Sequence, residues 1–223
     1  MSAVRAARSV TLALLLSLPV ARPARGAPPS TKGESDGAGK APSFARLLPP
    51  DFPKSRQVVQ VLTWEDANGT NAAVFSYDPS GTNALFVDQE AHRPGAAARR
   101  LRHVQDALGP CEGDVVVTFV KVPDPLVLTD LDHDGRAELT FGYRLACRTD
   151  VSPSTLKVLL LEDGAKFILR GESKVEAGCD EVLGGSFDPD PSLDKAPKEF
   201  RAHLERVWAA VVGDSWSREV AAP

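Results

Sequence analysis

Residues 114–145 read DVVVTFVKVPDPLVLTDLDHDGRAELTFGYRL, and this stretch decides the fold. Its two ends, 114–120 and 139–145, are rich in the β-branched and aromatic residues that favour strands. Between them lies a segment crowded with Asp and Gly, which favours a turn. The pattern therefore predicts two neighbouring antiparallel strands joined across an acidic loop.

Other apolar runs of the chain indicate further hairpins. An Asn-Gly pair at 68–69 separates two strand-like runs, 56–64 and 70–77, and both turn residues tolerate positive φ. An Asp-Gly pair at 163–164 separates a second pair of runs in the same way. The runs of this second pair are 156–162 and 166–170, and a further strand-like run lies at 84–88.

Two segments have the apolar spacing of amphipathic helices. In residues 96–108 the apolar positions are Leu101, Val104 and Leu108, and Gly-Pro follows directly. Residues 197–212 place a stripe of apolar side chains on one face: Phe200, Leu204, Val207, Trp208 and Val211. Together the elements predict a single α+β domain, a mainly antiparallel β-sheet with two covering helices.

The first 26 residues have the layout of a secretory signal peptide. A basic start precedes a short apolar core, VTLALLLSL at 10–18, and small residues follow at Ala24 and Gly26. Residues 27–43 are rich in Pro, Gly and Ser and contain no large apolar side chain, as is typical of a flexible linker. We therefore expect a signal peptide at 1–26, a linker at 27–43 and one domain at 44–223. The mature chain is expected to be periplasmic or extracellular, with no transmembrane segment.

The charge of the mature chain argues against a nucleic-acid partner. The whole sequence has 26 basic and 30 acidic residues, and the predicted signal peptide contains four of the arginines. Without those four, 22 basic residues face 30 acidic ones, a net charge of −8. Because such a surface repels phosphate backbones, we expect no nucleic acid among the partners.

Three cysteines, Cys111, Cys147 and Cys179, are expected to form one disulfide in an oxidising compartment. If the strands at 114–120 and 139–145 pair antiparallel, the residue numbers of facing residues have a nearly constant sum. With a sum of 258, Cys111 lies opposite Cys147, which predicts that these two are bonded and that Cys179 is free. A Cys147–Cys179 bond is the alternative that this register does not exclude.

The loop between the two strands has the residue pattern of a calcium site. Residues 130–138 read DLDHDGRAE, with carboxylates at loop positions 1, 3, 5 and 9 and glycine at position 6. Ca²⁺ takes roughly six to eight oxygen ligands, and alternate residues of a tightly wound loop point inward. The predicted ligands are four carboxylates and one backbone carbonyl, from Asp130, Asp132, Asp134, Arg136 and Glu138. The alternative is a solvated Asp-Gly turn.

The flanks of this loop distinguish it from an EF-hand. An EF-hand loop lies between helices and has a glutamate at position 12, whereas Phe141 stands there in this chain and the flanks are strand-like. The loop resembles the DxDxDGxx(D/E) calcium loops that join strands in integrin-type β-propellers. Those proteins have several copies and this chain has one, so the resemblance implies the metal-ligand roles and not the propeller fold.

Three further patterns accompany the loop motif DLDxDGxxE at 130–138: a strand ending in CR at 147–148, DVSPSxLK at 150–157 and FxxRG at 167–171. With these features, the region from about 58 to 216 resembles a family of bacterial secreted proteins described as surface polysaccharide biosynthesis proteins. The resemblance implies a role at the cell surface, and it implies no catalytic residues.

No catalytic residue is identified in the sequence. The four histidines are scattered and form no HExxH motif, and the positions of Trp64 and Trp208 favour core packing over a sugar-stacking role. We therefore expect a calcium-stabilised, non-catalytic module of the bacterial cell surface that is linked to surface polysaccharide. The alternative is a glycan-acting hydrolase or transferase that uses carboxylates the sequence does not identify.

Overall fold

The computed structural model describes residues 52–80, 83–177 and 181–214. The predicted signal peptide, the predicted linker and Cys179 lie outside these residues. Strands dominate the described part, as the sequence predicts. The elements in chain order are β1 (Gln57–Asp66), β2 (Gly69–Asp78), β3 (Ala84–His92), β4 (Arg99–Ala107), β5 (Asp114–Val120), β6 (Leu128–Thr129), β7 (Glu138–Arg148), β8 (Thr155–Glu162), β9 (Ala165–Glu172), β10 (Lys174–Glu176), β11 (Val182–Gly184), β12 (Phe187–Pro189), the 3₁₀ helix η2 (Pro191–Lys195) and α1 (Lys198–Val211).

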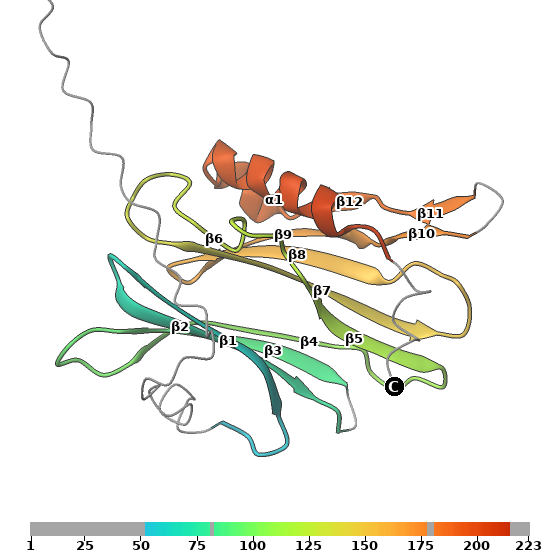
Figure 1. Cartoon of the computed structure of the whole chain (residues 1–223), viewed down its shortest axis with the longest axis horizontal. Helices are drawn as coiled ribbons and strands as arrows, with labels where there is room; N and C mark the ends of the chain where they lie inside the picture. Colours follow the sequence, from blue (N-terminus) through green and yellow to red (C-terminus); the bar gives the residue numbers. More distant parts are fainter. Residues whose placement is uncertain (1–51, 81–82, 178–180, 215–223) are drawn as a thin grey trace, which may run out of the picture.

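Strands β1 to β4 form an antiparallel meander that we call sheet A (Figure 1). The β1–β2 turn lies at the predicted Asn-Gly pair, with Asp66 opposite Gly69. Gly69 has a φ of 102°, and a Cβ at this position would lie 2.5 Å from the carbonyl oxygen of His92. Glycine is required there both for its backbone conformation and for the close approach of β3.

The second sheet, sheet B, has the strand order β12-β9-β8-β7-β5, with β6 also paired to β7. The predicted hairpin at 163–164 is confirmed as the β8–β9 turn, where Asp163 and Gly164 have φ values of 38° and 86°. Positive φ at both turn residues matches the twist of the flanking strands. Residues 158–161 of β8 are all fully buried, because sheet B is covered on both faces.

Two hydrophobic cores separate three layers: sheet A, sheet B and α1 (Figure 1). Between the sheets, Phe75 of β2 contacts Phe141 of β7 edge to face, with ring centroids 5.5 Å apart. The second core lies between sheet B and α1, which contacts β8 and β9. The predicted helical stripe is buried there, which confirms the helix expected at 197–212: Phe200, Leu204, Val207, Trp208 and Val211.

The prediction of a second helix at 96–108 is wrong. Most of this segment, Arg99–Ala107, forms β4, the strand that pairs with β3 at one edge of sheet A. Val104 and Leu108 both contact the core between the sheets, and their spacing of four residues fits a strand face as well as a helix face. Leu101 lies at a register shift, where an extra residue changes the phase of the strand. The helix-like spacing therefore arose from a bulged strand, and α1 is the one α-helix in the described ranges.

Strands β5 and β7 pair antiparallel as predicted, but in a different register. Facing residues sum to 262 rather than 258, so Val115 lies opposite Cys147. Cys111 lies before β5, and Gly113 lets the chain pass close to the end of β7, since a Cβ there would lie 2.3 Å from the carbonyl oxygen of Arg148. The predicted Cys111–Cys147 disulfide is confirmed, although the register used to predict it was wrong.

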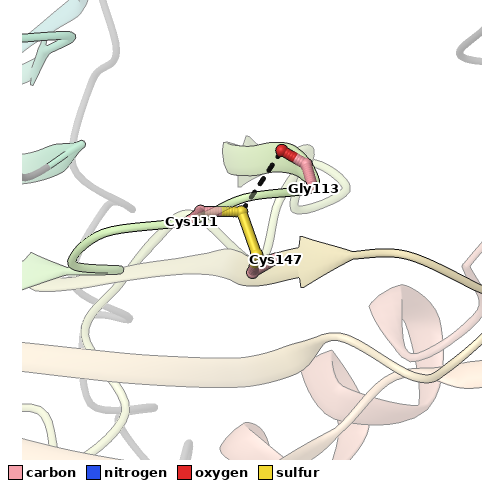
Figure 2. Close-up of a disulfide and its surroundings, with 3 residues drawn as sticks. All are labelled: Cys111, Gly113 and Cys147. Atoms are coloured by element: carbon pink, nitrogen blue, oxygen red, sulfur yellow. Dashed lines mark hydrogen bonds between the residues drawn. A yellow bond between two sulfur atoms is a disulfide. The ribbon is translucent and has the colours of Figure 1, made fainter.

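Figure 2 shows the surroundings of this disulfide. The Sγ atom of Cys111 lies 3.3 Å from the carbonyl oxygen of Gly113. An oxidised sulfur carries no hydrogen, so this is a close contact and not a hydrogen bond. The disulfide links the segment before β5 to the end of β7.

Candidate metal centre

The acidic loop connects β6 to β7 and is closed by the pairing of these two strands. Thr129 lies opposite Glu138, so residues 130–137 form the connection. The chain reverses at His133 and Gly135, which have φ values of 63° and 82°. Glycine adopts this conformation without strain, as expected for position 6 of the loop.

Hydrogen bonds from backbone amides to aspartate side chains wind the loop. The amide of Asp134 donates to Oδ1 of Asp132 at 3.2 Å, and the amide of Arg136 donates to Oδ1 of Asp134 at 2.7 Å. The amide of Gly135 donates to Oδ1 of Asp130 at 3.4 Å. Aspartate favours such local bonds, which explains why alternate aspartates produce a tight loop.

Three of the predicted ligands lie together. One carboxylate oxygen from each of Asp130, Asp132 and Glu138 lies within 4.8 Å of the other two. Carboxylates at this separation repel one another when ionised, and a cation bound between them removes the repulsion. Oxygen atoms are the ligands that hard cations prefer, so this acidic cluster can hold a metal ion.

Glu138 is the anchor of the cluster. Its side chain is fully buried, and it accepts hydrogen bonds from the Thr129 hydroxyl at 2.8 Å and the Leu131 amide at 2.9 Å. Burial raises the pKa of this carboxyl, while the hydrogen bonds from Leu131 and Thr129 partly oppose that shift. Glu138 therefore ties the start of the loop to β7 and presents its carboxylate toward the two aspartates.

A second acidic group shares Asp132 with the first. One carboxylate oxygen from each of Asp132, Asp134 and Glu162 lies within 4.8 Å of the others. Burial and the charges of the neighbouring carboxylates raise the pKa of Glu162 to about 7. Its Oε1 atom is buried and has no hydrogen-bond partner among the described residues.

Glu162 was not predicted as a site residue, although a signal for it exists. It lies 24 positions after Glu138, outside the loop motif. The β7–β8 pairing places Leu139 opposite Leu161, and the same register brings Glu138 beside Glu162 at the strand ends. Pairing the predicted strands at 139–145 and 156–162 by their apolar patterns would have brought the two glutamates together.

Asp134 and Arg136 form an ion pair within the loop. The guanidinium NH1 of Arg136 donates to Oδ2 of Asp134 at 2.6 Å, and Asp134 raises the pKa of this arginine. The predicted role of Arg136 is to supply its backbone carbonyl, and that role stays a prediction. In this arrangement the charge of Asp134 is partly neutralised, so Asp130, Asp132 and Glu138 form the stronger candidate set.

The β1–β2 turn of sheet A fastens the end of the loop. The carboxylate of Asp66 accepts hydrogen bonds from the Ala137 amide at 3.0 Å, the Trp64 indole at 3.1 Å and the Asn71 side chain at 2.8 Å. The Ala67 amide donates to the carbonyl oxygen of Gly135 at 2.8 Å. Asp66 thus holds the loop from the opposite sheet, a positioning role that the loop motif alone does not reveal.

The two tryptophans considered for sugar stacking are core residues, as their positions favour. Trp64 is 2% exposed and lies in the core between the sheets. Trp208 is 3% exposed, packs against Phe187 and donates its indole hydrogen to the carbonyl oxygen of Gly185 at 3.2 Å. Neither ring presents a face for a sugar.

No protein-family model, curated protein sequence or solved structure matches this chain. Within the described residues, no helix is both long and apolar enough to span a membrane.

Proposed function

We propose that the protein is an exported, calcium-stabilised module of the bacterial cell surface, associated with surface polysaccharide and without catalytic activity. The observation that carries the proposal is the group of carboxylates formed by Asp130, Asp132 and Glu138. These residues lie in a loop that is closed at both ends by β-strand pairing. A cation bound there would fix the connection between β6 and β7.

Calcium suits this site better than the other common hard cation. Ca²⁺ accepts a variable number of oxygen ligands in a flexible geometry, whereas Mg²⁺ demands near-octahedral coordination and releases its water reluctantly. The three carboxylates would supply part of the shell, and the Glu162 carboxylate lies beside those of Asp132 and Asp134. The Arg136 carbonyl is the further ligand that the sequence predicts. Bound water completes such a shell in many exposed calcium sites.

The Cys111–Cys147 disulfide is compatible with an exported protein. Bonds of this kind persist in oxidising compartments and are rare in the cytosol. The Cys111–Cys147 bond lies in the same sheet as the acidic loop, at the other end of β7. A periplasmic or extracellular setting also supplies the calcium concentrations at which weak loop sites are filled.

Calorimetric titration of the folded domain with calcium chloride tests the metal part of the proposal. We expect binding in the range of extracellular modules, with a Kd on the order of 10⁻⁴–10⁻³ M. Magnesium chloride at the same concentrations is the control and should release little heat. Equal binding of both ions would contradict the assignment to calcium.

A glycan array probed with and without calcium tests the polysaccharide part, which rests on the sequence resemblance. Calcium-dependent retention of bacterial surface glycans is the expected result. Turnover of a labelled polysaccharide would instead support the alternative of a glycan-acting enzyme. Calcium binding without any glycan retention would leave a purely structural envelope protein.

A further inference from the structure

Strand β4 of sheet A faces the β8–β9 hairpin of sheet B along one side of the sandwich. At one end of this seam, the guanidinium of Arg99 donates to Oδ1 of Asp163 at 2.7 Å. At the other end, Asp106 of β4 accepts a hydrogen bond from the ammonium of Lys157 and one from the Tyr143 hydroxyl at 2.9 Å. Two contacts between opposite charges therefore fix β4 against sheet B.

A pair of like charges lies between these two contacts. From Arg99 to Arg102 is three residues along β4, and from Asp163 to Lys166 is three residues along the hairpin. Val104 and Ile168 both belong to the core between the sheets. Arg102 and Lys166 lie two residues from them on the same strands, so they project from the same inner faces.

Neither of the two charges has an ion-pair partner among the described residues. The Nε of Arg102 is buried and has no hydrogen-bond partner among the described residues, and neither Arg102 nor Lys166 forms an ion pair there. Burial, followed by the charges of Arg102 and Arg170, lowers the pKa of Lys166. Asp190, which is paired with Arg170 at 3.2 Å, attracts Lys166 and opposes this shift only in part.

A buried amide lies beside Arg102. Gln89 of β3 is directly opposite Arg102 in the β3–β4 register, and its side chain is 1% exposed. Its Oε1 atom has no hydrogen-bond partner among the described residues. A buried amide oxygen that accepts no hydrogen bond costs free energy in an isolated fold, and such groups concentrate at functional sites.

We propose that Arg102 and Lys166 bind an oxyanion of a ligand, a carboxylate or a phosphate, at the seam between β4 and β9. A guanidinium matches the two oxygens of such a group with parallel hydrogen bonds, and an ammonium supplies a point charge. The unpaired Oε1 of Gln89 is an acceptor, so it suits a hydroxyl group of the same ligand and not the oxyanion itself. The ligand replaces the repulsion between the two cations with attraction to a shared anion.

Inward-pointing charges also protect edge strands from pairing with other chains, and that role requires no ligand. The two explanations differ in their response to anions. A protective charge responds to ionic strength alone, whereas a binding site distinguishes oxyanions from chloride at equal ionic strength.

The test uses thermal unfolding and calorimetry of the folded domain in metal-free buffer, with sodium phosphate, sodium glucuronate and sodium chloride at matched ionic strength. We expect one oxyanion to raise Tm above the chloride value, and Arg102→Gln with Lys166→Gln to weaken its binding about tenfold or more. Lys198→Gln is the control, because Lys198 lies on α1 with a 93% exposed side chain. A response to glucuronate alone assigns an acidic saccharide, and a response to phosphate alone assigns a phosphate group.

Two results would overturn the proposal. One is a wild-type response to both oxyanions that equals the response to chloride. The other is an oxyanion response that persists unchanged in the double variant. Lys166→Gln alone should fold and should be at least as stable as wild type without ligand, because it removes the like-charge repulsion.

Discussion

The two ends of β7 are fastened by different chemistry. At its first residue, Glu138 lies among carboxylates, and burial raises its pKa. At its last residues, Cys147 forms a disulfide and Arg148 forms a buried ion pair with Asp214. One end of β7 therefore carries an excess of negative charge. The other end is held by a covalent bond and by an ion pair whose charges balance.

This difference shows which end has its charges compensated without a ligand. At the disulfide end, Asp214 also accepts hydrogen bonds from Ser154 at 3.0 Å and Ser173 at 2.9 Å, and Arg144 donates to the carbonyl oxygens of Val211 and Gly213. At the loop end, the carboxylates have the hydrogen bonds that wind the loop but no full counter-charge. A cation would supply there what a covalent bond and arginine supply at the other end.

Removal of the disulfide should have the largest effect. The bond links residues separated by 36 positions, and the chain-entropy model gives about 3–4 kcal/mol for a loop of this size. Cys111→Ser combined with Cys147→Ser should lower the free energy of unfolding in urea by about that amount. Wild type in reducing buffer should match the variant, and an unchanged urea midpoint would show that the disulfide end does not depend on its covalent bond.

Loss of the Asp214 charge should have the next largest effect and should depend on pH. Burial opposes ionisation of this carboxyl, but Ser173, Arg144 and Arg148 outweigh it, so the pKa of Asp214 lies below its usual value. Its contribution is present above the unfolded pKa of about 3.9 and is lost as the pH falls through the lower folded value. Asp214→Asn should cost about 3 kcal/mol at pH 7, the low end for a broken buried pair.

The pH dependence separates this ion pair from ordinary packing. In urea titrations between pH 7 and pH 2, the difference between wild type and Asp214→Asn should narrow once the pH falls below about 4. A difference that stays constant over this range would mean that the charge of Asp214 does not stabilise the junction.

At the loop end, Asp66→Ala should cost about 2 kcal/mol, because it leaves the Trp64 indole and the Ala137 amide without their acceptor. Asp78→Ala is the matched control, since Asp78 also accepts bonds at the far end of β2 but does so at the exposed surface. The control should lose less stability than Asp66→Ala, because the bonds that Asp78 accepts lie at the solvent-exposed surface. Equal losses in thermal unfolding would show that Asp66 caps its own turn and does not hold the acidic loop.

A smaller effect of opposite sign is expected for Glu162→Gln. Because neighbouring carboxylates and burial disfavour its charge, removing that charge should stabilise the metal-free protein at pH 8. The gain should be about 1 kcal/mol or less, since the group is partly exposed and screened by solvent. A destabilised Glu162→Gln protein in metal-free buffer would contradict the idea of a charge excess at this end.

The elements that the sequence predicted correctly depend on local signals. The turns at 68–69 and 163–164 contain residues that tolerate positive φ, and α1 has a continuous apolar stripe. Strand β4 was missed because its bulge at Leu101 imitates helical spacing over a short window. Whether such a segment is a helix or a strand is decided by the neighbouring strand, which a local pattern does not contain.

The residues of the candidate site also divide into those with a local sequence signal and those that only the tertiary fold brings together. The carboxylates of Asp130, Asp132 and Glu138 were predicted from one contiguous motif, and the fold brings them together. Glu162 and Asp66 reach the same region only through the pairing of β7 with β8 and the packing of sheet A on sheet B. The disulfide was predicted correctly from a wrong register, because Gly113 lets the chain before β5 turn back toward β7.

Thermal unfolding of wild type and Asp132→Ala, each with millimolar calcium and with chelator, tests most directly whether a cation completes the loop end of β7. Calcium should stabilise wild type by about 0.4–1.4 kcal/mol for a Kd of 10⁻⁴–10⁻³ M. Asp132→Ala should stay folded and lose most of this response, because Asp132 belongs to both acidic groups. If wild type shows no calcium-dependent shift, the loop is an acidic turn and the two ends of β7 do not differ in the way proposed.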